Sequence, residues 1–201
     1  MDLNHHRQSI RLKYYDYSQA GYYFVTMCTQ NRECLFGDIK IGQMILNAAG
    51  KMIQEWWNKL LNKFTDIQID EYVIMPNHFH GIIGLVGAAP CGRPGVAHID
   101  GQPRGDGYGG GDRNGNGNGC GNGQPHGVAP TLGHIMDWFK TMTTNDYIRN
   151  VKFNHWPPFP GRLWQRNYYE HIIREEDDFL RIKEYIRTNP SHWEDDEENI
   201  L

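Results

Sequence analysis

Two histidines separated by one residue lie in an apolar stretch near the middle of the chain, and their spacing suits metal binding. Residues 72–85 contain two apolar runs rich in β-branched residues on either side of Pro76-Asn77, and Pro followed by Asn is typical of a turn. The pattern predicts a β-hairpin. Because successive strand side chains alternate between faces, His78 and His80 project from one face, about 7 Å apart along the strand. Two imidazoles placed in this way can bind one metal ion.

A histidine pair of this spacing also arises by chance, so a structural or merely polar-face role is the alternative. The position of the pair favours a ligand role. The histidines open a strand that re-enters the apolar interior, where an unpaired imidazole is costly to desolvate. We therefore expect a partner that satisfies them.

A second set of polar residues lies on the helix predicted over 175–188, which acidic residues open and Pro190 follows. Arg181, Tyr185 and Asn189 are spaced four residues apart and so lie near one face of this helix. The ordinary role of a lone helical Tyr is packing, and that of Asn189 is capping the helix end.

The elements that must position these residues follow in a recognisable order. Hydrophobic periodicity predicts a strand, a long helix, the hairpin, a second helix with Thr131 as its N-cap, a fourth strand and the last helix, over 22–29, 42–64, 72–85, 131–149, 163–173 and 175–188. This order predicts an α+β fold of the ferredoxin-like split βαβ type. The first and third strands should be central in a four-stranded antiparallel sheet with helices on one face, and a further C-terminal helix should pack near the histidines.

Length and composition limit the domain organisation. Of the 201 residues, 1–193 should form a single domain that a flexible glycine-rich insertion over 87–130 interrupts, and 194–201 should be a solvated acidic tail. The net charge of −4 excludes a strongly basic surface. No apolar run approaches the roughly 20 residues of a membrane span and the first residues are no signal peptide. We therefore expect a cytoplasmic protein without membrane contact.

Three blocks of the chain, in the same order, resemble the signature blocks of the REP-associated tyrosine transposases, within the single-tyrosine HUH transposase superfamily. The resemblance runs from about Tyr14 to Trp193, apart from the insertion. The blocks are Met75-Pro76-Asn77-His78-Phe79-His80, Trp164-Gln165-Arg166-Asn167-Tyr168-Tyr169-Glu170-His171-Ile172-Ile173-Arg174 and Glu184-Tyr185-Ile186-Arg187-Thr188-Asn189-Pro190.

This resemblance implies a site and an activity. His78 and His80 would hold a divalent cation, Mg²⁺ or Mn²⁺, with Asn189 as a third, oxygen ligand. Tyr185 on the C-terminal helix would be the nucleophile that cuts single-stranded DNA at hairpin-bearing, palindromic repeats and forms a 5′-phosphotyrosine. The family resemblance also implies DNA transposition, association with the nucleoid, and a monomer or homodimer.

DNA contacts are predicted from basic residues that lie near aromatic ones, because single strands are bound by phosphate neutralisation and base stacking. These residues are Arg11, Lys13, Lys140, Arg162 and Arg166.

Two other functions compete with the transposase. One is a domesticated, non-cutting DNA-binding protein. The other is a nucleotide hydrolase of the histidine-triad kind, which Ile82 disfavours because it occupies the place of the third alternating histidine.

Overall fold

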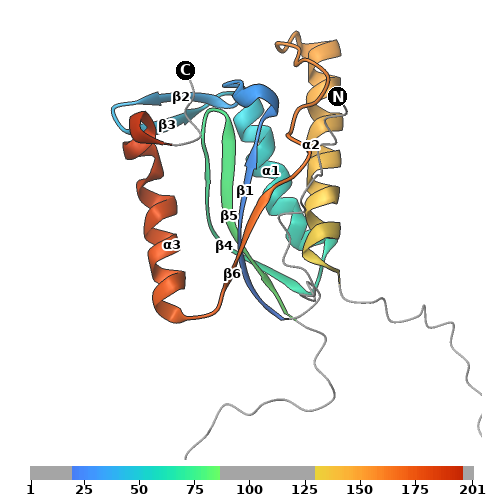
Figure 1. The fold of residues 1–201 in the computed structure, drawn as a ribbon. Helices are drawn as coiled ribbons and strands as arrows, with labels where there is room; N and C mark the ends of the chain where they lie inside the picture. The colour runs from blue at the N-terminus through green and yellow to red at the C-terminus, as the bar shows by residue number, and fades with distance from the viewer. Residues whose placement is uncertain (1–19, 87–129, 197–201) are drawn as a thin grey trace, which may run out of the picture. The chain divides into compact units, whose positions relative to one another are not determined.

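The structure is a computed structural model that describes residues 20–86 and 130–196 (Figure 1). Several predictions fall outside these residues. They concern Arg11, Lys13, the glycine-rich insertion as far as residue 129, and the acidic tail from residue 197 onward.

Four strands form one antiparallel sheet in the described part of the chain. Strands β1 (Gly21–Cys28), β4 (Ile67–Ile74), β5 (His78–Leu85) and β6 (Tyr169–Ile173) are ordered β4-β5-β1-β6 (Figure 1). The first and third strands of the predicted pattern, β1 and β5, are central, as expected. The order is that of a ferredoxin-like sheet, and it confirms the predicted fold class.

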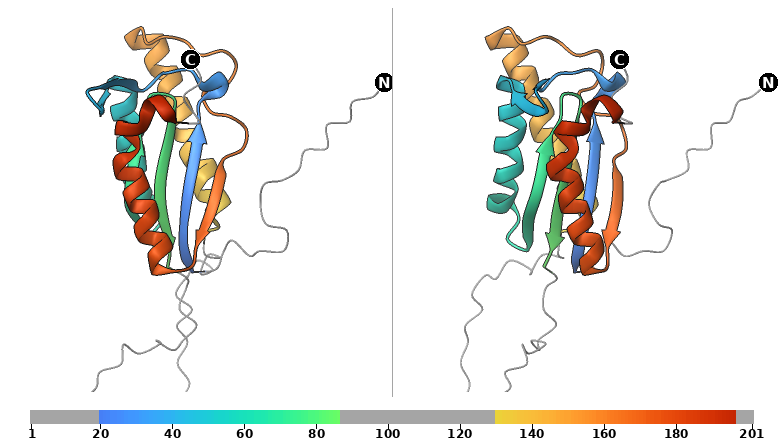
Figure 2. Two further views of the ribbon diagram at one scale, coloured as in Figure 1. Left: turned by 60° about the vertical axis from the view of Figure 1, so that its left-hand side comes forward. Right: turned by 90° about the vertical axis from the view of Figure 1, so that its left-hand side faces the viewer.

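Helices cover both faces of this sheet (Figure 2). Helices α1 (Ala48–Lys63) and α2 (Leu132–Asn154) pack on one face, and α3 (Glu176–Thr188) lies on the other. A large core that includes Trp57, Phe79 and Phe139 fills the α1/α2 side. A smaller core under α3 contains Phe24, Ile82, Ile173, Ile182 and Ile186. The strands therefore divide their alternate side chains between a thick apolar layer and a thin one that leaves room for a site.

The helix predicted over 42–64 begins later than expected. Strands β2 (Gly37–Lys40) and β3 (Gln43–Leu46) form a separate hairpin, and α1 starts only after Asn47. The Asn47 side chain accepts a hydrogen bond from the backbone N–H of Gly50 at 3.0 Å, and so caps the helix. The two strands before this cap have only four residues each, too few to show a period of their own, so the helical pattern after the cap was extended over β3.

The second predicted helix is confirmed at its start and extended at its end. Thr131 caps α2 by accepting a hydrogen bond from the backbone N–H of His134 at 3.2 Å. The helix continues five residues beyond Arg149 to Asn154, and His155 ends it in a left-handed conformation at φ 55°.

The fourth predicted strand is shorter than expected, because only Tyr169–Ile173 joins the sheet as β6. The residues just before it form a loop that a side chain of α2 holds in place. The Lys140 ammonium donates to the carbonyl oxygens of Gln165, Arg166 and Asn167 at 2.8, 3.1 and 3.5 Å. These residues lie between β6 and an isolated antiparallel bridge that pairs Trp164 with Thr29, so the predicted strand is interrupted where its carbonyls bind Lys140.

The last helix starts at Glu176, one residue later than predicted, and three acidic residues occupy its first turn. It ends at Thr188, but the chain does not become irregular at Asn189-Pro190. A 3₁₀ helix, η2 (Asn189–Asp195), follows directly. This segment returns the chain toward β5, which matters for the site.

Candidate metal centre and tyrosine site

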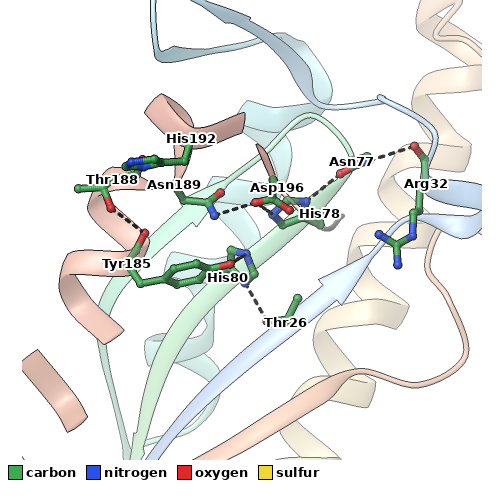
Figure 3. Close-up of polar contacts among 10 residues, drawn as sticks. All are labelled: Thr26, Arg32, Asn77, His78, His80, Tyr185, Thr188, Asn189, His192 and Asp196. Atoms are coloured by element: carbon green, nitrogen blue, oxygen red, sulfur yellow. Dashed lines mark hydrogen bonds and ion pairs between the residues drawn. The ribbon is translucent and has the colours of Figure 1, made fainter. Parts of the chain in front are cut away.

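His78 and His80 lie side by side on β5, on the face that α3 covers (Figure 3). Their side chains are buried, with residue exposures of 0% and 2%, and the ring centroids are 4.5 Å apart. The alternation predicted from the sequence therefore places both imidazoles on one face and close together.

Hydrogen bonds from neighbouring elements orient the two rings. The Asn77 amide Nδ2 donates to the carbonyl of Arg32 at 3.2 Å, so its Oδ1 is left to accept from Nδ1 of His78 at 2.8 Å. His78 then carries its proton on Nδ1 and presents Nε2 to the site. Nδ1 of His80 lies 2.7 Å from the Thr26 hydroxyl on β1. Such partners fix the tautomer of a metal-binding histidine.

Burial affects the protonation of His80. Desolvation, followed by the neighbouring imidazole of His78, lowers the pKa of His80 well below its ordinary value. His80 is therefore neutral near pH 7. Neutral imidazole is the form that binds a metal ion.

Asp196 completes a group of three ligands that sequence reasoning missed. Its Oδ2 lies 3.9 Å from Nε2 of His78, and its side chain is only 4% exposed. The ligand atoms of His78, His80 and Asp196 all lie within 4.8 Å of one another, so these residues could hold a metal ion. The expectation of a solvated acidic tail is wrong for Asp196, because η2 folds the chain back over the histidines. No spacing signal marks this residue among its acidic neighbours.

Asn189 lies beside the candidate metal ligands, and its side chain is hydrogen-bonded to one of them, which the sequence did not predict. Its Nδ2 donates to Oδ2 of Asp196 at 2.9 Å. The residue is 3% exposed, and its Oδ1 is buried without a hydrogen-bond partner among the described residues. Asn189 therefore orients the carboxylate and keeps one buried oxygen available, which fits a cation beside it.

Tyr185 reaches this group from α3 (Figure 3). Its hydroxyl oxygen lies 3.2 Å from Nε2 of His80, and the residue is 45% exposed. The Tyr185 ring packs edge-on against Phe24 at a centroid distance of 6.0 Å. The Tyr185 hydroxyl therefore contacts the buried His80 while its ring borders solvent, where a large substrate can reach it.

Ion pairs fasten α3 to both edges of the sheet and so position Tyr185. On the β4 side, Nζ of Lys183 lies 2.6 Å from Oδ1 of Asp70, and Nε of Arg187 donates to Oε1 of Glu71 at 2.9 Å. Asp70 and Glu71 lie in an irregularity of the β4–β5 pairing. Lys183 lowers the pKa of Asp70 despite the opposing effect of desolvation.

The other edge of the sheet holds α3 through His171 of β6. Its Nε2 lies 2.6 Å from Oδ2 of Asp178, at the start of α3. This bond, with that from Arg181, lowers the pKa of Asp178. His171 therefore has a structural hydrogen-bonding role that joins β6 to α3.

The predicted DNA-binding residues fall into two groups. Arg11 and Lys13 lie outside the described residues. Lys140, Arg162 and Arg166 line one open pocket of about 380 Å³ beside α2. Arg162 and Arg166 are exposed, whereas Lys140 already binds three loop carbonyls. The structure brings these three together, but in a pocket that shares no lining residue with the groove around Tyr185.

The groove around Tyr185 is the larger one, with a volume of about 1000 Å³. The groove is lined by His80, Tyr185, Asn189 and Asp196, so it opens directly onto the candidate metal ligands.

None of the helices in residues 20–86 and 130–196 is long and apolar enough to cross a membrane.

The described residues form an α+β fold that is similar to the fold of a solved transposase. The structure is similar to a solved structure of a REP-associated tyrosine transposase bound to a REP hairpin, with a TM-score of 0.52 and 18% identity, over 91% of this chain and 73% of that one. No protein-family model matches the chain. An uncharacterized protein of Haemophilus influenzae strain Rd is 38% identical over 195 residues, which cover 96% of this chain and 93% of that protein. The chain belongs to the same family as this protein.

Proposed function

We propose that this protein is a metal-dependent single-stranded DNA endonuclease and strand transferase of the tyrosine HUH type, with Tyr185 as its nucleophile. One observation carries the proposal. The Tyr185 hydroxyl lies 3.2 Å from Nε2 of His80, within a buried group of two histidines and a carboxylate. A nucleophile beside a metal-ligand set is an arrangement that supports phosphoryl transfer.

His78, His80 and Asp196 would hold the divalent cation, with Oδ1 of Asn189 as a further oxygen donor. A bound Mg²⁺ or Mn²⁺ would polarise a non-bridging phosphate oxygen and offset the charge of the transition state. Two imidazoles among the ligands favour Mn²⁺ over Mg²⁺, because Mg²⁺ prefers an all-oxygen shell.

The remaining chemistry belongs to Tyr185. Its oxygen forms a bond to phosphorus and loses its proton to solvent, while the bond from phosphorus to the 3′-oxygen breaks and that oxygen takes up a proton. The products are a 5′-phosphotyrosine and a free 3′-OH. The new ester conserves the bond energy, so a later 3′-OH can displace Tyr185 and rejoin the strand.

The substrate in this proposal is single-stranded DNA that carries palindromic hairpins. The similar transposase was solved with a hairpin, which supports this choice. The protein would act on the nucleoid in the cytoplasm, as a monomer or homodimer, in transposition or repeat mobilisation. A single domain over residues 1–193, interrupted by the insertion, is part of the same proposal.

The test is the formation of a covalent protein–DNA adduct. End-labelled single strands with palindromic hairpins are incubated with the protein and Mn²⁺, Mg²⁺ or EDTA, and adducts are detected on denaturing gels. We expect a metal-dependent adduct with the wild type and none with Tyr185→Phe, which loses only the hydroxyl. Tyr22→Phe is the matched control, because Tyr22 is a partly exposed tyrosine on β1 whose hydroxyl bonds to Gln68.

An adduct that persists in Tyr185→Phe would remove Tyr185 from its role. DNA binding without any adduct, over a panel of repeats from the host genome, would instead support the domesticated, non-cutting protein.

A further inference from the structure

The groove extends beyond the metal ligands and Tyr185 to a second region that the chemistry above does not use. Tyr169 on β6 and Arg181 on α3 line this region. We propose that it binds the nucleotide next to the cleaved phosphate, with its base stacked on Tyr169 and its phosphate paired with Arg181. This inference rests on the proposed function.

Strand register places Tyr169 in line with the site. Thr26 of β1 is paired with His80 of β5 on one side and with Tyr169 of β6 on the other. These three side chains form a row across the α3 face of the sheet. Adjacent strands are about 4.8 Å apart, so the Tyr169 backbone lies about 10 Å from that of His80. A nucleotide next to a phosphate held at His80 is therefore within reach of Tyr169.

Exposure makes Tyr169 suitable for stacking. The residue is 55% exposed on an edge strand, although it points to the face that α3 covers. The ring of Tyr169 is therefore exposed to a base that enters the groove. Aromatic rings that line a channel are the sequence-tolerant base contacts of single-strand binding proteins.

Arg181 provides the positive charge in this part of the groove. It precedes Tyr185 by one turn of α3 and therefore lies on the same face. Its Nη2 donates to Oδ1 of Asp178 at 2.5 Å, and Asp178 is itself bonded to His171. The side chain is still 77% exposed. The guanidinium is thus oriented while most of its surface is left for a phosphate.

Charge also selects the direction that the strand takes. The groove is also lined by Asp195, at the end of η2, and by the adjacent Asp196. The cation held by the metal ligands would offset the charge of Asp196, but Asp195 still repels a phosphate backbone, whereas Arg181 attracts it. The chemistry recognised is therefore a single-stranded nucleotide and its phosphate.

Binding is measured without cutting, in a Tyr185→Phe background with Mg²⁺ present. The probe is a fluorescein-labelled oligothymidylate of about 15 nucleotides, near the upper site size of single-strand binding folds. Fluorescence anisotropy gives its Kd. We expect Tyr169→Ala to weaken binding about 5- to 150-fold, and Tyr169→Trp to preserve it because the stacking face remains. Phe153→Ala is the control, since Phe153 is a 74% exposed aromatic on α2 that lies outside the groove.

The salt dependence of Kd tests Arg181 separately. Loss of one phosphate contact should reduce the slope of log K against log salt by about 0.7 in Arg181→Ala. The matched control is Arg149→Ala. Arg149 is 69% exposed and pairs with Asp146 three residues before it, as Arg181 does with Asp178. Its removal should leave the slope unchanged.

The outcomes separate the two proposals. Should the parent protein bind the probe and the Tyr169→Ala and Arg181→Ala variants bind it equally well, with unchanged salt slopes, the nucleotide site is wrong while the proposed function stands. A parent that neither binds DNA nor, with Tyr185 restored, forms an adduct overturns both. Thermal unfolding of each variant shows whether it is folded, and Tyr169→Leu replaces Tyr169→Ala if the alanine variant is not.

Discussion

Replacement of Asp196 by asparagine should weaken Mn²⁺ binding strongly. The Asp196 side chain is 4% exposed, and its Oδ2 lies 3.9 Å from Nε2 of His78 and accepts a hydrogen bond from Asn189 at 2.9 Å. Asparagine has nearly the same shape, and its amide oxygen can still accept from Asn189. The substitution therefore removes mainly the negative charge from the ligand group.

The structure sets the size of this effect. At an effective dielectric constant of about 20, two unit charges 4 Å apart interact by about 4 kcal/mol. A carboxylate that binds the cation directly gains at least this much. Part of the gain is offset by the loss of the ion's hydration, whereas the carboxylate itself is already buried and oriented by Asn189. We expect a loss of about 2–4 kcal/mol, which is a 30- to 1000-fold weaker affinity.

Electron paramagnetic resonance of free Mn²⁺ during titration with protein measures this affinity directly. Asp195→Asn is the matched control, because it removes the same charge from the adjacent, exposed residue. Solvent and salt screen that charge, so its loss should change the affinity little. Equal affinities of Asp196→Asn and the wild type would refute Asp196 as a ligand. Equal losses of Mn²⁺ affinity in both variants would show that Asp196 acts through the negative charge of this segment and not by coordination.

Three further changes have expected outcomes. Tyr185→Phe should bind Mn²⁺ about 2- to 10-fold more tightly in the same titration, because a cation that binds Nε2 of His80 must first displace the hydrogen bond between this nitrogen and the Tyr185 hydroxyl, which are 3.2 Å apart. Burial lowers the pKa of Lys140 to about 8. Between about pH 8 and pH 10.5 the unfolded chain therefore binds more protons than the folded protein, so the free energy of unfolding of the wild type should rise with pH. Urea denaturation should show this rise to be about 2 kcal/mol larger in the wild type than in Lys140→Met. Ile41→Asn should stabilise the protein by about 1 kcal/mol, because Ile41 is fully exposed at φ 52° beside Gly42, and Asn-Gly suits a hairpin turn with two positive φ angles.

Each of these expectations has a contrary result. Weaker Mn²⁺ binding by Tyr185→Phe would make the tyrosine oxygen itself a ligand. Parallel pH profiles of the wild type and Lys140→Met would mean that the carbonyl bonds keep Lys140 charged throughout. A lower urea midpoint of Ile41→Asn would show that the Ile41 side chain makes a stabilising contact.

Much of the fold could be predicted because it depends on local patterns. Alternation along β5 determines that His78 and His80 share a face, and the order of strands and helices determines which strands are central. Capping by Thr131 is likewise local, since the hydrogen bond spans three residues. The β2–β3 hairpin was missed because its four-residue strands are too short to show a period of their own.

The site itself was only partly predictable. The sequence by itself determined the two histidines, and the four-residue spacing of Tyr185 and Asn189 on one helix face. Only the tertiary structure decided that Asp196 completes the ligand set, because η2 must fold over β5 to bring the two together. The same is true of Thr26, which contacts His80 through pairing of strands that are 54 residues apart along the chain. A periodic pattern specifies which face a side chain takes, whereas packing of distant segments specifies what it meets there.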